Sequence, residues 1–202
     1  MVLEYIIIVI YSFALILIFM YAVAQLNLLF NYISAQKKVD TSPKFDFTNS
    51  EEIPFVTIQL PVYNEMYVME RLLENIVKLD YPRAKLEIQV LDDSTDESII
   101  TTKKQIRELQ KAGIDIQHIQ RSNRQGFKAG ALKEGLEIAK GEFIAIFDAD
   151  FLPEKDWLLQ TIPYFKNEEI GVVQTRWGHL NRNYSTLTKV QAFALDAHFT
   201  LE

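Results

Sequence analysis

The sequence predicts an α/β protein, with a mostly parallel sheet flanked by helices and one transmembrane helix before it. Residues 5–24 are apolar almost without interruption, which is long enough for a membrane helix. From residue 55 onward, short apolar runs alternate with stretches of helical periodicity, a pattern typical of βαβ units. Several apolar runs end in polar or acidic residues, as expected at the rim of a parallel sheet.

Composition restricts the class of protein and the kinds of site. The chain has 202 residues, 24% charged and 49% hydrophobic, so one globular domain plus an appendage is expected. The absence of cysteine excludes disulfides and thiolate metal sites and fits a reducing compartment. The formal net charge of −6, without a basic stripe, predicts no nucleic-acid partner.

The apolar run from Tyr5 to Ala24 is predicted to be a transmembrane helix. Ser12 is its only clearly polar residue, and twenty helical residues cover about 30 Å of hydrocarbon. A cleaved signal peptide is disfavoured, because the run is long and neither a basic leading segment nor a small-residue cleavage site accompanies it. The membrane is therefore an expected partner.

Charges beside this run predict its orientation. Glu4 precedes it, and Lys37, Lys38 and Lys44 follow it. By the positive-inside rule, the amino terminus faces out and everything after the helix is cytoplasmic. The resulting domain assignment is a membrane helix with its flank in 1–33, a juxtamembrane linker in 34–52, and the α/β domain in 53–202.

Strand and helix signals alternate beyond the linker. Residues 143–147 are apolar without interruption, so they are expected to form a central strand covered on both faces. The other expected elements are strands at 55–62, 86–91, 115–120 and 170–176, and helices at 69–77, 127–139 and 153–165.

One further helix is predicted from its two ends. Ser94 and Glu97 have the spacing of a capping box, which predicts that the helix starts there. Gly113 then ends it after about Ala112, because glycine is favoured just past a helix.

Three expected strands end in polar clusters: Tyr63-Asn64-Glu65, Asp92-Asp93 and Asp148-Ala149-Asp150. The carboxyl ends of parallel strands share one edge, so these clusters should converge on a single cleft. The last pair of carboxylates suits Mg²⁺ or Mn²⁺ carrying a diphosphate. Taken alone, Asp92 and Asp93 could equally be a helix-start cluster, since acids favour that end of a helix.

The segment from Arg121 to Lys128 brings three cations next to Gly126, at the start of an expected helix. Helix amino termini attract anions, so a diphosphate would suit this loop. A solvated basic loop is the alternative. The histidines do not cluster in sequence and are expected to be structural or solvated, and the tryptophans are expected to pack, although Trp177 could line the cleft.

Five motifs together resemble one family. They are LPVYNE (60–65), LDDSTD (91–96), NRQGFKAGAL (123–132), FDADF (147–151) and VQTRW (173–177). In this order and spacing, residues 55–202 resemble the membrane-anchored family 2 glycosyltransferases. These are inverting enzymes of the GT-A (Rossmann-like) fold, among them cellulose, mannan and glucomannan synthases and ceramide glucosyltransferase.

The resemblance implies roles for both ends of a nucleotide-sugar donor. Tyr63 and Glu65 would line the pocket for the base, and Asp92 or Asp93 would hydrogen-bond it. At the diphosphate end, the implied ligands are Lys128 for the phosphates and Asp148 with Asp150 for the divalent metal, Mg²⁺ or Mn²⁺.

The reaction implied by the resemblance transfers a hexose from UDP-glucose or GDP-mannose to a polysaccharide or lipid acceptor, forming a β-linkage. The family's catalytic base lies in a later TED-like motif, and a QxxRW motif follows it; neither is found, because Gln174 to Trp177 has the wrong spacing. The chain is therefore expected to hold the donor- and metal-binding half, and to transfer sugar poorly by itself.

Two other functions fit parts of the sequence. A membrane-bound module that binds nucleotide sugars without catalysis is the main alternative. A phosphatase of the haloacid dehalogenase type also uses Asp-x-Asp after an apolar strand, but on its first strand, whereas here about three strands precede the pair.

Overall fold

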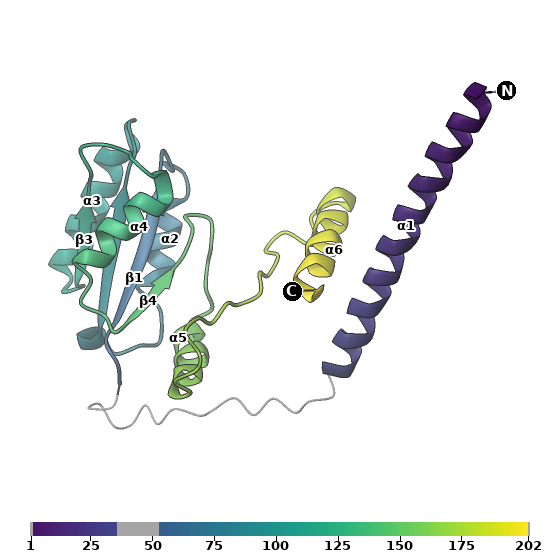
Figure 1. Ribbon diagram of the computed structural model, residues 1–202. Helices are drawn as coiled ribbons and strands as arrows, with labels where there is room; N and C mark the ends of the chain where they lie inside the picture. The colour runs from purple at the N-terminus through teal and green to yellow at the C-terminus, as the bar shows by residue number, and fades with distance from the viewer. Residues whose placement is uncertain (1, 36–52, 202) are drawn as a thin grey trace. The chain divides into compact units, whose positions relative to one another are not determined.

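The computed structural model describes residues 2–35 and 53–201 (Figure 1). They belong to two compact units: residues 172–201 group with the N-terminal helix, and residues 53–171 form the unit that contains the sheet. The linker and the basic residues Lys37, Lys38 and Lys44, used above to predict orientation, lie outside the described residues.

The N-terminal helix α1 (Val2–Ala35) has 34 residues. It is long and apolar enough from Val2 to Ser34 to cross a membrane, and its candidate span is not buried by the rest of the protein. Its residues carry almost no charge, since Glu4 in the first turn is its only acid or base. The expected apolar helix is therefore present as a candidate membrane span.

The sheet unit alternates strands with helices, as expected. Its elements are β1 (Val56–Val62), α2 (Met69–Ile76), η1 (Arg83–Lys85), β2 (Leu86–Asp92), α3 (Ser98–Lys111), β3 (Ile116–Ile119), α4 (Phe127–Glu137), β4 (Phe143–Ile146), α5 (Trp157–Thr161) and η2 (Ile162–Lys166). The unit that contains α1 also contains α6 (Thr186–Leu201).

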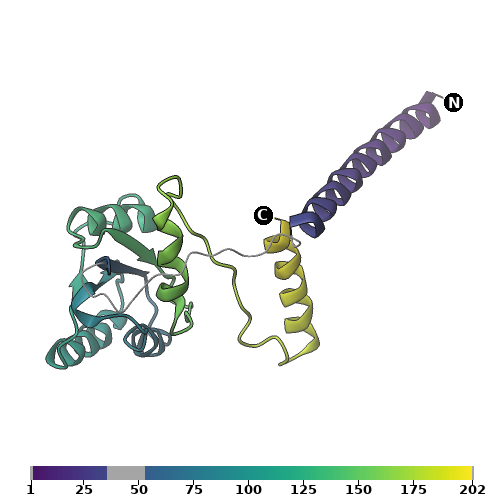
Figure 2. The ribbon, with the colours of Figure 1, turned by 90° about the horizontal axis from the view of Figure 1, so that it is seen from below.

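The four strands pair in parallel in the order β3-β2-β1-β4. The chain moves outward from β1 to β3 and then crosses back to place β4 on the other side of β1. Figure 2 looks nearly along the strands and shows α2 and α3 on one face of the sheet and α4 on the other. The change of direction makes the carboxyl ends of β1 and β4 a topological switch point, where open α/β sheets bind ligands.

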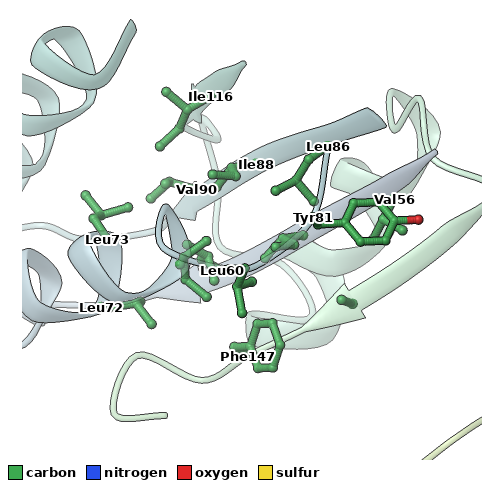
Figure 3. Packing of buried hydrophobic residues seen from close by; sticks show 14 of the residues in the cluster. Val56, Leu60, Leu72, Leu73, Tyr81, Leu86, Ile88, Val90, Ile116 and Phe147 are labelled. Atoms are coloured by element: carbon green, nitrogen blue, oxygen red, sulfur yellow. The ribbon is translucent and has the colours of Figure 1, made fainter. Parts of the chain in front are cut away.

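One face of the sheet carries the apolar core. Alternate residues of β1 and β2 point to this face, because successive strand side chains point to opposite sides. Val56, Leu60, Ile88 and Val90 lie there with Leu72 of α2, all at most 1% exposed (Figure 3). Ile106 of α3 is also buried in this cluster.

The opposite face is polar, although α4 covers it. Gln59 donates to Gln89 at 3.0 Å, and the fully buried Glu87 accepts from the Thr57 hydroxyl at 2.7 Å and from the Gln117 amide at 2.8 Å. Buried polar groups persist when they are paired in this way. Gly135 lets α4 approach these side chains, since a Cβ there would lie 2.6 Å from Gln59 Nε2.

The prediction that 143–147 forms a central strand was wrong. Among the described strands β4 lies at an edge and pairs only with β1, and Ile146 is 46% exposed. The apolar residues of its other face pack against the following helices: Phe147 contacts Trp157 and Phe143 contacts Phe165, each with ring centroids 4.7 Å apart. The apolar run therefore signals side-chain packing and not a central position.

The prediction of a strand at 170–176 was also wrong. These residues have no strand conformation, they cross the boundary between the units, and Val172 is 81% exposed. A strand needs a neighbour to satisfy its backbone groups, and none of the described strands pairs with this segment.

Two predicted helix starts were misplaced. The helix after β2 begins at Ser98 and not at Ser94. Asp96 accepts hydrogen bonds from the Ser98 backbone N–H and hydroxyl, whereas the Ser94 hydroxyl accepts from the Asn64 N–H. The helix expected from Pro153 begins at Trp157 and continues from Ile162 as a 3₁₀ turn, with Pro163 near its start.

Candidate functional site

A cleft of ≈ 400 Å³ lies at the carboxyl edge of the sheet. Residues from all three predicted polar clusters line it, so the expected convergence is present. The lining residues are Pro61, Val62, Tyr63, Glu65, Leu91, Asp93, Arg124, Lys128, Ala131, Asp148, Ala149 and Asp150. The resemblance gave a role in donor or metal binding to seven residues, and six of them line the cleft; the exception is Asp92.

The loop after β1 is tied to the loop after β2. Asn64 has a left-handed backbone, with φ of 58°, a conformation that asparagine tolerates better than most residues. Its backbone N–H donates to Ser94 Oγ at 2.8 Å, and its side-chain oxygen accepts from the Thr95 N–H at 2.9 Å. These bonds fix the turn that holds Tyr63 and Glu65, which both line the cleft.

Asp93 is held by a buried ion pair with Arg121, which the sequence did not reveal. The guanidinium donates through Nε to Oδ1 at 2.9 Å and through a terminal nitrogen to Oδ2 at 2.5 Å. The Arg121 and Asp93 side chains are only 4% and 8% exposed. This two-pronged geometry fixes the carboxylate in orientation as well as position. Opposite charges that follow adjacent strands were the available signal in the sequence.

The same guanidinium shapes the loop that leads into α4. Arg121 donates to the carbonyl oxygens of Gln125 and Phe127, at 3.0 Å each. The loop turns tightly through Gly126 and Phe127, which have φ of 73° and 49°. Gly130 must lack a side chain, because a Cβ there would lie 2.0 Å from the Gln125 carbonyl oxygen.

Arg124 lies flat on Tyr63, another contact that the sequence did not reveal. Its Cζ is 3.3 Å from the centre of the tyrosine ring, and its Nε is 3.9 Å from Asp93 Oδ2. Of the three cations expected to face an anion together, Arg121 is buried in its ion pair, whereas Arg124 and Lys128 line the cleft.

The acid pair follows β4 on a tight turn, closed by the Phe151 N–H donating to the Asp148 carbonyl at 3.0 Å. Ala149 between the acids is 7% exposed, while both carboxylates line the cleft. The Lys128 ammonium pairs with Asp148 Oδ1 across the cleft. The cleft wall thus combines Lys128 and the acid pair, from the start of α4 and the turn after β4, with Tyr63, Glu65 and Asp93 from the loops after β1 and β2.

The acid pair fits a divalent cation that a ligand helps to coordinate. Within the described part of the chain, no group of three or more His, Asp or Glu side chains is placed to hold a metal by itself. Mg²⁺ and Mn²⁺ accept such incomplete sites when a substrate diphosphate supplies further oxygen ligands. Asp148 and Asp150 offer hard oxygen donors in a cleft large enough for such a ligand.

Asp92 lies behind the cleft and not on its wall. It is 3% exposed; its Oδ2 lies 2.7 Å from His118 Nε2, and its Oδ1 accepts from the Ser94 N–H at 2.9 Å. Burial acts to raise the pKa of the Asp92 carboxyl, but the hydrogen bonds from His118 and Ser94 outweigh it and hold the pKa below its ordinary value. His118 therefore has a structural role, as expected.

This pairing predicts a pH dependence of stability. Because the pKa of Asp92 is lowered in the folded state, its stabilisation is complete above the unfolded pKa of about 3.9 and is lost as pH falls through the folded value. We expect Asp92→Asn to be less stable than wild type at pH 7 and the difference to shrink below about pH 4. Urea unfolding across this pH range measures the difference in the free energy of unfolding, and Glu108→Gln, at an exposed position of α3, is the control. A difference that widens in acid would contradict the lowered pKa of Asp92.

His179 and Trp177 belong to the unit that contains α1 and have partners within that unit. His179 Nε2 lies 3.3 Å from Asp196 Oδ1, a carboxylate that also accepts from Arg176 and Arg182. Trp177 packs on Phe199, with ring centroids 5.1 Å apart. These contacts match the structural roles expected for histidine and tryptophan, and the His198 side chain lies outside the described residues.

Comparisons with known proteins show the family to which the chain belongs. The family described as glycosyl transferase family 2 matches residues 57–198. The chain is 45% identical over 154 residues to probable glucomannan 4-beta-mannosyltransferase 11 of Oryza sativa subsp. japonica, covering 74% of this chain and 27% of that protein. It is 37% identical over 182 residues to glucomannan 4-beta-mannosyltransferase 1 of Cyamopsis tetragonoloba, covering 86% and 32%.

Among solved structures, it is similar to the mannosyltransferase PcManGT from Pyrobaculum calidifontis in complex with GDP-Man and Mn²⁺. That likeness has a TM-score of 0.62 and 30% identity, and covers 77% of this chain and 46% of the other. The chain spans only 27% and 32% of the two curated relatives named above.

Proposed function

Because this chain belongs to glycosyl transferase family 2, we propose that its cleft binds a nucleotide-sugar donor together with a divalent cation. The whole enzyme would be an inverting hexosyltransferase that passes mannose from GDP-mannose to a polysaccharide acceptor and forms a β-glycosidic bond. The observation that carries this proposal is that one cleft is lined by an acid pair and a lysine together with Tyr63, Glu65 and Asp93.

The two ends of the cleft suit the two ends of the donor. Tyr63 presents an aromatic surface and Asp93 a fixed carboxylate that can accept hydrogen bonds from a base. Lys128 lies at the start of α4, where backbone N–H groups and a cation both attract phosphate oxygens. The diphosphate is therefore proposed to lie between Lys128 and the acid pair.

Bond cleavage places negative charge on the departing nucleoside diphosphate. The acceptor hydroxyl gives its proton to a general base and attacks the anomeric carbon from the face opposite the diphosphate, so the configuration inverts as the bond to the phosphate oxygen breaks. The ammonium of Lys128 stabilises the charge that develops on that oxygen. Mg²⁺ or Mn²⁺, held by Asp148 and Asp150, would supply further neutralisation of the diphosphate.

GDP-mannose is favoured over UDP-glucose as the donor. The curated relatives at 45% and 37% identity are named as mannosyltransferases, and the similar solved structure was obtained with GDP-Man and Mn²⁺. Their names likewise favour a glucomannan-type polysaccharide over a lipid as the acceptor. The haloacid dehalogenase alternative is disfavoured by the position of the acid pair, which follows the fourth strand.

Donor binding tests the proposal directly. The full chain in detergent is titrated with GDP-mannose and with UDP-glucose, with Mn²⁺ and with EDTA, by calorimetry. We expect Mn²⁺ to tighten binding, and GDP-mannose to bind more tightly than UDP-glucose. Binding of neither donor would refute the proposed site, whereas tighter binding of UDP-glucose would refute only the choice of sugar nucleotide.

Lys128→Ala is expected to have opposite effects on the metal and on the donor. The ammonium pairs with the Asp148 oxygen that is proposed to ligate the metal, so it competes with Mn²⁺ until phosphates draw it away. Its removal should tighten the binding of Mn²⁺ alone and weaken GDP-mannose by about tenfold, the loss of one hydrogen bond to a charged group. Mn²⁺ binding followed by electron paramagnetic resonance measures the first effect, and Lys133→Ala in α4 is the control. Weaker Mn²⁺ binding in Lys128→Ala would show that the lysine does not compete.

We also propose that α1 spans the membrane and that the sheet unit is cytoplasmic. The length and apolarity of α1 support the span, and the lysines that follow it in the sequence support the orientation. Protease added outside intact cells should leave the sheet unit uncut, and cleavage there would reverse the orientation.

A further inference from the structure

The helix α6 carries an apolar face that no described part of the chain covers. Leu187, Val190 and Phe193 are 67%, 60% and 72% exposed, and their spacing of three residues puts them on one side of the helix. Ala192, on the opposite side, is 1% exposed. We propose that this face docks on the surface of a membrane, with its three large side chains among the lipid headgroups. The inference goes beyond donor binding and rests only on the proposed span of α1.

The contact between α6 and α1 lies at the depth of a membrane surface. The two helices belong to one unit and contact each other. Among the described side chains of α1, only Gln25 and Tyr32 are partly covered, which places the contact near the carboxyl end of α1. The apolar run ends at Ala24, so Gln25 and Tyr32 lie about 2 and 12 Å beyond it along the helix. The headgroup layer of a bilayer is about 5–8 Å thick, and α6 therefore meets α1 within and just beyond that layer.

The charge of this part of the chain suits anionic lipids. Residues 171–195 contain Arg176, Arg182 and Lys189 but no Asp or Glu, in a chain whose formal net charge is −6. Asp196 follows and accepts hydrogen bonds from both arginines, so two guanidiniums share one carboxylate and the cluster keeps an excess of positive charge. A basic residue next to an anionic leaflet raises membrane affinity by about fivefold.

Two aromatic side chains that precede α6 have the character of interfacial residues. Tyr184 is 87% exposed, and Trp177 is 45% exposed although it packs on Phe199. Tyrosine and tryptophan combine an apolar ring with a polar group, which concentrates them at the boundary between membrane and water. Large apolar groups exposed together mark an interaction surface. Their combination with basic residues, and with a candidate membrane helix in the same unit, favours a lipid surface over a protein partner.

The experiment measures the depth of α6 in the full chain, reconstituted in vesicles of phosphatidylcholine and phosphatidylserine. The chain has no cysteine, so Val190→Cys or Leu187→Cys carries a single fluorescent label. We expect nitroxide groups on the lipid headgroups to quench both labels several-fold more than a label in Lys104→Cys, at an exposed position of α3 in the sheet unit. Ile16→Cys, inside α1, tests the span and should be quenched by nitroxides on the acyl chains.

The charge of α6 provides a second measurement with the label at position 190. Lys189→Gln should lower the ratio of docked to undocked α6 by about fivefold, the contribution of one basic residue next to an anionic surface. Vesicles of phosphatidylcholine alone should also lower this ratio. Lys104→Gln, which removes the same charge from α3, should leave the quenching unchanged.

Each contrary result overturns a stated part of the proposal. Labels at Val190 and Leu187 that emit as they do in water would show that the face lies in solution. Labels that are shielded from water but escape the nitroxides would show that protein covers the face, either a second copy of this chain or another segment of a longer one. Quenching unchanged in Lys189→Gln and in uncharged vesicles would refute the role of anionic lipids. Absence of quenching at Ile16→Cys as well would refute the span of α1, whereas donor binding by the cleft is measured separately.

Discussion

Asp150→Ala is expected to lower GDP-mannose affinity in the presence of Mn²⁺ by about a hundredfold and to leave the weaker affinity in EDTA unchanged. Asp150 lies on an exposed turn and lines the cleft, so its carboxylate is available to a metal that also binds the diphosphate. Charge neutralisation by such a metal is worth several kcal/mol, and every 1.4 kcal/mol corresponds to a tenfold change in affinity.

The exposure of Asp150 makes this test specific to binding. Removing an exposed side chain that supports no buried group should change the free energy of unfolding by less than about 0.5 kcal/mol. Glu154→Ala, which removes an exposed acid four residues away, is the matched control and should retain the metal effect. If Asp150→Ala kept its Mn²⁺-dependent affinity, the acid pair would not be the metal site.

Arg121→Ala is expected to lower the free energy of unfolding by about 3–5 kcal/mol, the cost of leaving a buried charge without its partner. The Arg121 and Asp93 side chains are 4% and 8% exposed, so water cannot replace the lost ion pair. The variant also loses the bonds to the Gln125 and Phe127 carbonyls that shape the loop before α4. Donor binding should weaken as a consequence, because this loop carries Arg124 and leads directly to Lys128 at the start of α4.

The structure offers a close control for this prediction. Arg124 lies near the same carboxylate, at 3.9 Å, but is 38% exposed, so Arg124→Ala should cost less than about 1 kcal/mol. Urea denaturation of both variants measures the difference. Combining Arg121→Gln with Asp93→Asn should cost less than the sum of the single changes, since the two groups are coupled. Equal destabilisation by Arg121→Ala and Arg124→Ala would show that burial does not set the strength of the pair.

Part of the cleft could be predicted from the sequence because its residues follow the ends of strands. Tyr63 and Asp148 follow an apolar residue directly, and Asp93 follows Leu91 after one further acid, Asp92. Parallel pairing brings the ends of such strands to one edge. Lys128 was found through its motif. Asp92 was not separated from Asp93, because only the pleat of β2 decides that Asp92 is buried with His118 while Asp93 lines the cleft.

The sequence by itself determined the parallel α/β class, the apolar N-terminal helix and the convergence of the polar strand ends, since these depend on periodicity and local order along the chain. Only the tertiary structure decided that β4 lies at an edge, that residues 170–176 form no strand, and that Arg121 and Arg124 have different partners. Those outcomes depend on which segments meet in space. The ion pair of Arg121 with Asp93 and the cation–π contact of Arg124 with Tyr63 join residues 28 and 61 positions apart, so no periodic pattern in the sequence reveals them.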